Sequence, residues 1–73
     1  MSQAYQTNTQ VKWNWGNGTA SGLIREIYRE KVTRTIKGSE ITRNGSDDNP
    51  AYVIVQEDGN RVLKLHSELE KNI

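Results

Sequence analysis

The residues best suited to nucleophilic chemistry are His66 and Ser67, which are adjacent near the end of the chain. A hydrolytic site needs a base beside its nucleophile and usually a third residue that orients the base. His66 is the only histidine, and the sequence contains no cysteine. Ser67 precedes Glu70 by three residues, the spacing of a helix capping box, so a structural role explains the serine better. We therefore expect no catalytic residue and no enzymatic activity.

Oxygen-bearing and glycine-rich segments give no better indication of a cofactor. Asp47 and Asp48 offer the oxygen atoms that calcium prefers, but the spacing matches no calcium loop and the glutamate at the twelfth position is missing. Gly16, Gly18 and Gly22 lie in a predicted turn that no helix N-terminus follows, so they do not form a phosphate loop. The absence of cysteine excludes thiolate metal sites and disulfides. The sequence predicts neither a metal nor a cofactor.

Aromatic side chains are the next candidates for ligand binding. Trp13 and Trp15 lie on one face of a predicted strand, and with Tyr52 they would form a cage that attracts a methylated ammonium group, an interaction worth up to ~2 kcal/mol. The alternative is that these are the largest core residues of a 73-residue chain without phenylalanine. We favour the core, because a domain this small has few other means of stabilising itself.

The charged residues are unevenly distributed along the chain. Residues 25–43 contain six basic and three acidic side chains, whereas residues 44–73 contain three basic and six acidic ones. Such asymmetry suits a polyanion or a second copy of the same chain, but a solvated surface with mixed charges explains it more simply than either. A nucleic-acid strand would meet Arg34 and Arg43 through its phosphates, while Tyr28 stacks on a base. The net charge of only +1 and the pI of about 8.1 argue against this alternative.

The arginines are positioned by a predicted central hairpin. Residues 32–36 and 41–43 are rich in β-branched side chains, and the Gly38-Ser39 pair between them favours a type II′ turn. This register places Ile36 opposite Ile41 and Arg34 opposite Arg43. Two like charges side by side are unfavourable, so the register indicates that an outside partner contacts them.

A second hairpin is predicted from residues 51–57 and 60–65, which close around Asp58-Gly59. Its register pairs Val55 with Val62. Both faces are then partly apolar: Tyr52, Ile54, Leu63 and Leu65 lie on one, and Val53, Val55 and Val62 lie on the other. One face lines the core, and the other must be covered by sheet curvature, by the N-terminal tail or by a partner chain.

The remaining segments complete an all-β pattern. Residues 10–15 alternate as a half-buried strand, residues 16–22 form a turn-rich loop, and residues 23–28 favour a strand, although a helix would also suit their spacing. We expect a flexible tail over residues 1–8 and one domain over residues 9–73, with a short C-terminal helical turn that Ser67 caps. About five short strands without a crossover helix predict a small β-barrel.

Several motifs resemble a known family: Val-Lys-Trp-Asn-Trp-Gly-Asn-Gly-Thr-Ala (11–20), Val-Thr-Arg-Thr-Ile-Lys-Gly-Ser-Glu-Ile-Thr-Arg-Asn-Gly-Ser (32–46), Asn-Pro-Ala-Tyr (49–52), Gln-Glu-Asp-Gly-Asn-Arg-Val-Leu-Lys (56–64) and Ser-Glu-Leu-Glu (67–70). The chain resembles the hypervirulence-associated protein Tudor-domain family of small bacterial and fungal proteins, which have no established biochemical activity. Where members usually carry Gly-Asp, this chain has Asn8-Thr9, a departure that affects only the entry turn. The resemblance implies an SH3-like, Tudor-like barrel and no particular reaction.

The sequence thus favours a non-enzymatic interaction module that forms a homodimer. Self-association explains both the charge asymmetry and the two-sided hairpin, whereas nucleic-acid binding explains only the asymmetry. The sequence has no apolar run near the roughly 20 residues of a membrane span and no signal peptide, so we expect a cytoplasmic protein without a membrane or small-molecule partner. The predicted ligand-binding residues are Trp13, Trp15, Tyr28, Tyr52, Arg34 and Arg43. The predicted interface residues are Arg34, Ile36, Ile41, Arg43, Val53, Val55 and Val62.

Overall fold

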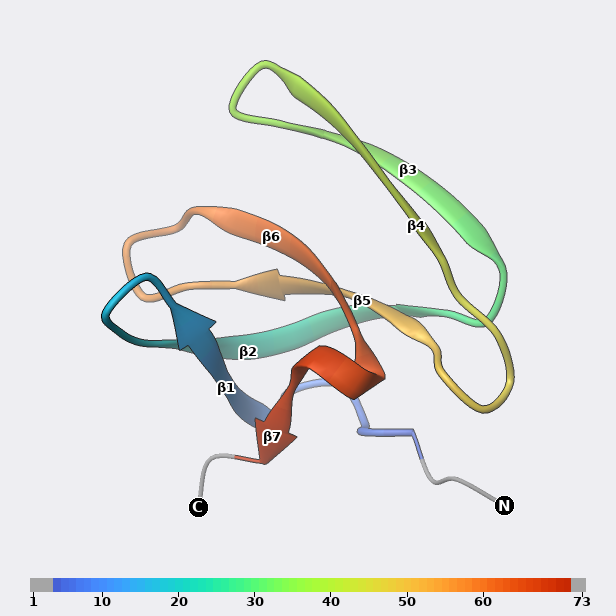
Figure 1. Cartoon of the computed structure of the whole chain (residues 1–73), viewed down its shortest axis with the longest axis horizontal. Coiled ribbons are helices and arrows are strands. Elements are labelled where there is room, and N and C mark those ends of the chain that lie inside the picture. The colour runs from blue at the N-terminus through green and yellow to red at the C-terminus, as the bar shows by residue number, and fades with distance from the viewer. Residues whose placement is uncertain (1–3, 72–73) are drawn as a thin grey trace.

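Short antiparallel strands make up the fold of residues 4–71, the part of the chain that this computed structural model describes (Figure 1). Residues 1–3 of the predicted tail and residues 72–73 of the predicted domain lie outside the described residues. The elements are β1 (Gln10–Trp15), β2 (Gly18–Tyr28), β3 (Lys31–Ile36), β4 (Ser39–Asn44), β5 (Ala51–Val55), β6 (Arg61–Leu65), a 3-10 turn (His66–Glu68) and β7 (Glu70–Lys71). The predicted all-β class is confirmed.

The strands form two sheets instead of one closed barrel. Five of them pair in the order β6-β5-β2-β1-β7, and β3 pairs with β4 in a separate two-stranded sheet. Figure 1 shows this hairpin, in green, rising over β5 and β6 and diverging from them towards its tip. The SH3-like barrel that the resemblance implies is therefore open between the hairpin and the larger sheet.

Each face of the β5–β6 hairpin contacts a different apolar core. The first core consists of Val11, Trp13, Ile24, Tyr52, Ile54 and Leu69, with Val62 at its margin. The second consists of Val32, Ala51, Val53 and Leu63, against which Tyr28, Ile36, Ile41 and Leu65 pack. Because β5 is buried on both faces, its sequence is a continuous apolar run. The chain's own β3–β4 hairpin covers this second face, so neither the N-terminal tail nor a partner chain is needed to cover it.

The turn of the β3–β4 hairpin lies one residue earlier than predicted. Lys37 and Gly38 both have positive φ, 52° and 78°, the requirement of a type I′ turn. Arg34 consequently pairs with Ile41, and Val32 pairs with Arg43. The predicted Arg34–Arg43 pairing is wrong, and with it the like-charge contact that indicated an outside partner. The pairs shift by two positions, so each side chain keeps its predicted face.

The β5–β6 register also differs from the prediction. Gly59 has a φ of 86°, and the amide of Gln56 donates to the carbonyl of Asn60 at 2.8 Å. The connection is thus a three-residue loop with a left-handed glycine, not a two-residue turn. The extra residue pairs Val53 with Leu63 and Ile54 with Val62, which moves the β6 side chains to the opposite face. The predicted common face of Val53, Val55 and Val62 is therefore wrong.

Strand β2 is longer and more irregular than predicted. It begins at Gly18 after a two-residue turn, so the predicted loop over residues 16–22 is wrong, whereas the choice of strand over helix for residues 23–28 is confirmed. A register shift between Ile24 and Glu26 marks a bulge at Arg25. The bulge lets Ile24 and Ile27, three residues apart, contact the first core together. Glu26 is then free to contact β3.

The predicted C-terminal helical turn is present, but its cap is not Ser67. The 3-10 turn spans His66–Glu68, and the Glu68 carboxylate accepts a hydrogen bond from the Leu65 amide at 2.9 Å. Leu69 is buried in the first core, which returns the chain to the sheet, where β7 pairs with β1. No helix in the described residues is long and apolar enough to cross a membrane.

A polar contact inside the first core ties the N-terminal segment to the sheet. The buried Tyr52 hydroxyl accepts a hydrogen bond from the Tyr5 amide at 2.9 Å and contacts His66 Nδ1 at 2.8 Å. Burial raises the pKa of Tyr52. Asn8 adds an amide hydrogen bond to the Ile24 carbonyl at 2.7 Å. Tyr52 and His66 are therefore occupied by structural contacts.

Candidate ligand-binding groove

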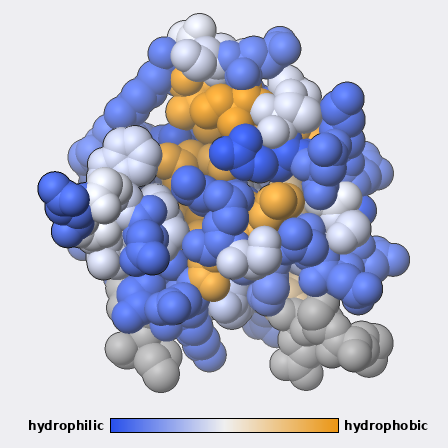
Figure 2. Space-filling view, in the orientation of Figure 1, coloured by the Kyte–Doolittle hydropathy of each residue, from blue (hydrophilic) through white to orange (hydrophobic). Residues whose placement is uncertain are grey.

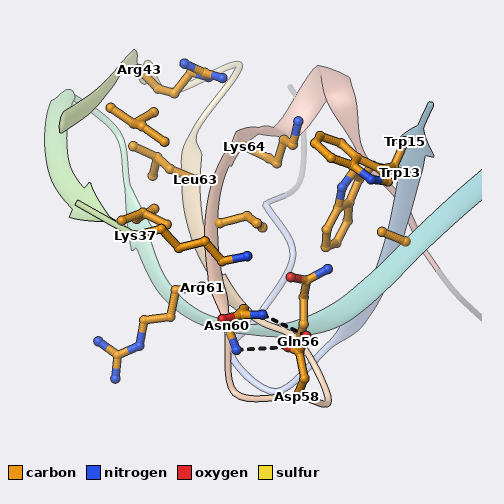
Figure 3. A pocket seen from close by; sticks show the side chains of 14 residues that line it. Trp13, Trp15, Lys37, Arg43, Gln56, Asp58, Asn60, Arg61, Leu63 and Lys64 are labelled. Carbon is orange, nitrogen blue, oxygen red and sulfur yellow. Dashed lines mark hydrogen bonds between the residues drawn. The ribbon is translucent and has the colours of Figure 1, made fainter. Parts of the chain in front are cut away.

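A groove of about 390 Å³ lies between the β3–β4 hairpin and strands β1 and β6 (Figure 3). We call it the β6 groove. Its floor is apolar and consists mainly of Trp13, Ile36, Ile41, Val62 and Leu63. Its rim carries the basic residues Lys37, Arg43, Arg61 and Lys64 and one acidic residue, Asp58. Figure 2 shows the corresponding apolar surface, in orange, in the upper half of the view, bordered by hydrophilic side chains.

The floor is apolar because both cores reach the surface along β6. Val62 and Leu63 are consecutive strand residues, so their side chains point to opposite faces of the sheet. Val62 lies beside Trp13 of the first core, and Leu63 lies beside Ile36 and Ile41 of the second. The groove therefore has two apolar sides, separated by the β6 backbone.

Trp15 lines the groove but is not part of either core. Its side chain is 70% exposed, whereas Trp13, on the same strand face, is 4% exposed. Trp15 pairs with Gly18 at the turn end of β1, where the partner strand offers no side chain to cover the ring. The core interpretation thus holds for Trp13 and Tyr52 but not for Trp15. A large exposed aromatic ring beside an apolar groove is typical of binding surfaces.

The rim charges differ in how far they are neutralised. Arg43 Nε and Lys64 Nζ lie 3.6 Å and 3.9 Å from the two carboxylate oxygens of Glu68. Lys37 and Arg61 form no ion pair within the described residues. These two cations are therefore the most available to a ligand.

The single rim acid is directed into its own turn. The Asp58 carboxylate accepts hydrogen bonds from the amide of Asn60 at 3.0 Å and from its side-chain nitrogen at 2.7 Å. These contacts, the backbone one first, hold the pKa of Asp58 below its ordinary value. The rim thus presents four basic groups against one acid that is already hydrogen-bonded.

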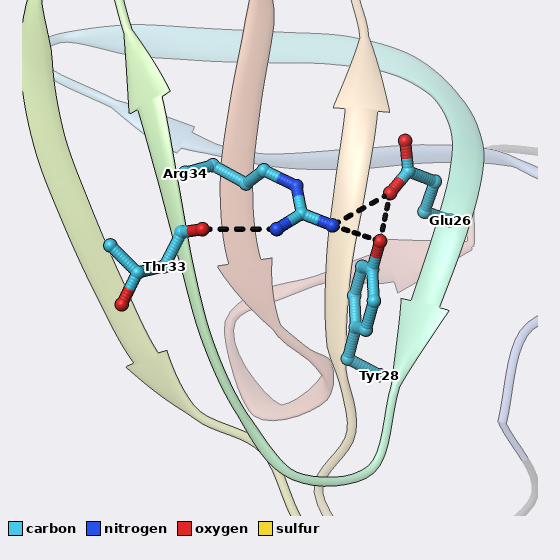
Figure 4. Close-up of polar contacts among 4 residues, drawn as sticks. All are labelled: Glu26, Tyr28, Thr33 and Arg34. Atoms are coloured by element: carbon cyan, nitrogen blue, oxygen red, sulfur yellow. Dashed lines mark hydrogen bonds and ion pairs between the residues drawn. The ribbon is translucent and has the colours of Figure 1, made fainter.

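Arg34 and Tyr28, two predicted ligand residues, form a separate cluster with Glu26 (Figure 4). Arg34 Nη2 lies 3.2 Å from Glu26 Oε1, and the Tyr28 hydroxyl hydrogen-bonds with both side chains. The guanidinium carbon lies 4.7 Å from the centre of the Tyr28 ring, a cation–π contact. Hydrogen bonds from Tyr28 and then Arg34 hold the pKa of Glu26 below its ordinary value of 4.5. Arg34 is thus already paired.

The lowered pKa of Glu26 predicts a pH dependence of stability. Because folding lowers this pKa, the contribution of the carboxylate is complete above about pH 4.5 and is lost as the pH falls below it. The Glu26→Gln variant lacks that contribution, so its unfolding free energy should decline less with acid than that of the wild type. Urea unfolding between pH 6 and pH 3 measures the difference. Parallel curves for the two proteins would contradict the prediction.

The structure brings together only some of the predicted site residues. Trp13, Trp15 and Arg43 line the groove, as do Ile36, Ile41 and Val62 from the predicted interface. Tyr52 is buried in the first core and does not line the groove, so the cage of Trp13, Trp15 and Tyr52 does not form. Lys37, Arg61 and Lys64 also line the groove, although the sequence did not predict them as site residues. For Arg61 and Lys64 the signal was their position on either side of the apolar pair Val62-Leu63, whose faces the wrong register assigned incorrectly.

The arrangement of an apolar floor and a basic rim suits binding. No cluster of three or more histidine, cysteine, aspartate or glutamate side chains within residues 4–71 would hold a metal ion. The profile of the family described as hypervirulence associated proteins TUDOR domain matches residues 9–69, most of the chain. No curated protein and no solved structure matches the chain.

Proposed function

This chain belongs to the hypervirulence-associated protein Tudor-domain family, and we propose on that premise that it is a non-enzymatic binding module whose ligand site is the β6 groove. The family is one of unknown function, and no catalytic family is indicated. The observation that carries the proposal is the combination of an apolar floor, a basic rim and an exposed Trp15. A fitting ligand carries negative charge together with apolar or flat groups.

Two physical arguments support the groove as the binding site. Burying an apolar floor and an exposed indole against a ligand is favourable in proportion to the apolar area removed from water. The basic rim attracts an anion, but this attraction between exposed charges is screened within about 8–10 Å at ordinary ionic strength. Binding should therefore weaken with added salt without disappearing.

Charge reversal at the two unpaired cations tests the proposal. The double variant Lys37→Glu, Arg61→Glu should bind an anionic probe at least about tenfold more weakly, because two attractive contacts become repulsive. The probes are a peptide of alternating valine and glutamate and an oligothymidylate of equal charge. Titrations followed by backbone amide chemical shifts report both the affinity and the location.

Lys31→Glu is the matched control for these titrations. Lys31 is exposed on β3 and does not line the groove, so its reversal changes the net charge without changing the site. The control should keep wild-type affinity. If neither probe shifts the amide signals of the groove residues, the β6 groove is not a ligand site.

Self-association by exchange of the β3–β4 hairpin is a second candidate. The expected Arg34–Arg43 contact and the Val53, Val55 and Val62 face do not support it, because neither is present. What favours it is that the hairpin has no hydrogen-bonded strand neighbour in the larger sheet among the described residues and packs by side chains alone. Light scattering decides: exchange requires a mass near twice 8.3 kDa that persists on dilution, and a mass near 8.3 kDa contradicts it.

Nucleic-acid binding through residues 25–43 remains a prediction with less support. Arg34 is paired with Glu26, and Arg43 is paired with Glu68, so these arginines are not free to follow a phosphate backbone. The oligothymidylate titration tests this possibility at the groove directly.

A further inference from the structure

Two of the four rim cations of the β6 groove are already paired with an acid from outside the groove. The carboxylate of Glu68, in the 3-10 turn that follows β6, lies 3.6 Å from Arg43 Nε and 3.9 Å from Lys64 Nζ. Glu68 itself does not line the groove. Lys37 and Arg61 have no ion-pair partner within residues 4–71. The rim therefore has one neutralised pair of cations and one available pair.

The two pairs lie towards opposite ends of the groove. Arg61 begins β6 and Lys64 follows three residues later, a separation of about 10 Å along a strand. Figure 3 shows Arg43 and Lys64 in the upper part of the view and Lys37 and Arg61 below them. The exposed ring of Trp15 is also in the upper part, beside Lys64. The groove thus offers available charge at one end and an exposed aromatic ring at the neutralised end.

Glu68 is held at the neutralised end by more than its attraction to the cations. Its Oε1 atom also accepts a hydrogen bond from the amide of Leu65, the residue before the 3-10 turn, at 2.9 Å. Because this acid belongs to the same chain, its effective concentration at Arg43 and Lys64 is high. A ligand carboxylate that displaced it would also leave the Leu65 amide without its acceptor. The neutralised end is therefore a poor site for a second anion.

We propose that Glu68 determines the specificity of the β6 groove by excluding polyanions, so that the groove binds a short segment of another protein with one acidic side chain beside an aromatic or apolar one. The acidic side chain contacts Lys37 and Arg61, and the ring packs against Trp15. All of these contacts are made by side chains at the exposed rim. This inference rests on the proposed function and narrows its ligand class.

A protein segment fits the open groove better than a free small molecule or a nucleic acid does. Trp15 is 70% exposed, so the groove is open on that side, whereas small-molecule sites usually bury about 70–90% of the ligand surface. A segment within a larger partner covers such a groove because the partner extends beyond it. Single-stranded nucleic acid carries a phosphate at every nucleotide, so it would direct anions to both ends of the groove.

Two peptides that differ by one charge test the role of Glu68. Both are blocked at their termini: Glu-Val-Trp-Val-Gln carries one acid, and Glu-Val-Trp-Val-Glu carries two. With the wild type, the second glutamate should raise the affinity by less than about threefold. With Glu68→Gln it should raise the affinity at least about fivefold, because Arg43 and Lys64 are then available. The glutamine still offers an oxygen acceptor to the Leu65 amide.

Glu70→Gln is the matched control, because it makes the same change of charge two residues away. Glu70 lies 3.9 Å from Lys12 and does not line the groove. In this variant the second glutamate should have the same small effect as in the wild type. Urea unfolding establishes that Glu68→Gln is folded. If it is not, the comparison of the two peptides on the wild type still tests the proposal.

The outcomes separate the inference from the proposed function. A gain above about threefold in the wild type, or a gain in Glu68→Gln that only matches the wild type, would overturn the role of Glu68. Free indolepropionate has the same charge and ring as the peptide with one acid and should bind at least about tenfold more weakly. Equal binding would overturn the protein partner.

The proposed function survives each of these results, because the groove still binds a ligand. It also survives, without the inference, if oligothymidylate binds the groove and the peptides do not. If none of these ligands shifts the amide signals of the groove residues, both the proposed function and the inference fail.

Discussion

The Gly45→Ala variant should be less stable than the wild type by about 2–4 kcal/mol, because the added methyl group has no space. An alanine Cβ at this position would lie 2.6 Å from the Tyr28 carbonyl oxygen, 2.9 Å from the Glu30 carbonyl oxygen and 3.0 Å from the Ala51 nitrogen. All three are backbone atoms, so no side chain can rotate away. The Gly45 amide also donates to the Glu30 carbonyl at 3.2 Å, a bond that the displacement would break.

The consequences of this variant should extend to the β6 groove. Gly45 lies directly after β4, where the chain leaves the β3–β4 hairpin and passes the end of β2 on its way to β5. Moving this crossing shifts the hairpin relative to the second core. Ile36, Ile41 and Arg43 would then change position against β6, so affinity for an acidic peptide should also fall.

Gly18→Ala is the control for the glycine substitution. Its Cβ would meet no atom within 4 Å, and its φ is not positive, so its stability should stay within about 0.5 kcal/mol of the wild type. Urea unfolding monitored by circular dichroism measures both variants. Equal midpoints for Gly45→Ala and the wild type would show that the backbone relaxes around the methyl group without cost.

Element type was predictable from the sequence because it depends on local pattern. The alternation of residues 10–15, the β-branched runs and the glycine turns each favour strands over helices. The glycines at the two hairpin connections, Gly38 and Gly59, were also identified correctly, since each has positive φ, although the type of turn was wrong at both. Local chemistry therefore sufficed for the fold class and for the positions of the two hairpins.

Strand register was not predictable, because the same glycine fits more than one turn. Gly38 satisfies a type II′ turn with Ser39 and equally a type I′ turn with Lys37. Gly59 satisfies a two-residue turn and equally the left-handed position of a three-residue loop. The choice between the two turns at Gly59 decides which face of the sheet Val62 and Leu63 occupy. The incorrect register made that hairpin resemble a dimer interface, whereas the observed register makes its edge the floor of a groove.

The candidate site was only partly predictable, because it depends on where strands end in space. Trp13 and Trp15 have the same residue type and the same predicted face, and no sequence pattern separates them. Their difference arises from pairing: Trp13 lies opposite Ala20 within the sheet, and Trp15 lies opposite Gly18 beside the turn. Lys37, Arg61 and Lys64 come together with them only through the packing of the hairpin over β6.

Replacing Trp13 by alanine should be the most destabilising single change in β1, at about 3–5 kcal/mol. Its indole packs within the first core among Val11, Ile24 and Ile54, so truncation removes a large apolar contact and leaves a cavity. Urea unfolding gives the free-energy difference directly. A small domain has little stability in reserve, so the variant should be substantially unfolded at 37 °C.

Trp15→Ala provides the matched comparison, because it makes the same chemical change two residues away on the same strand. Its ring is 70% exposed, so stability should change by no more than about 0.5 kcal/mol. Affinity for the valine–glutamate peptide should instead fall at least about tenfold, since the ring forms part of one side of the groove. A large loss of stability in Trp15→Ala would show that both tryptophans serve the core. A stable variant with unchanged affinity would remove Trp15 from the binding site, whereas the expected separation of the two effects assigns folding to Trp13 and recognition to Trp15.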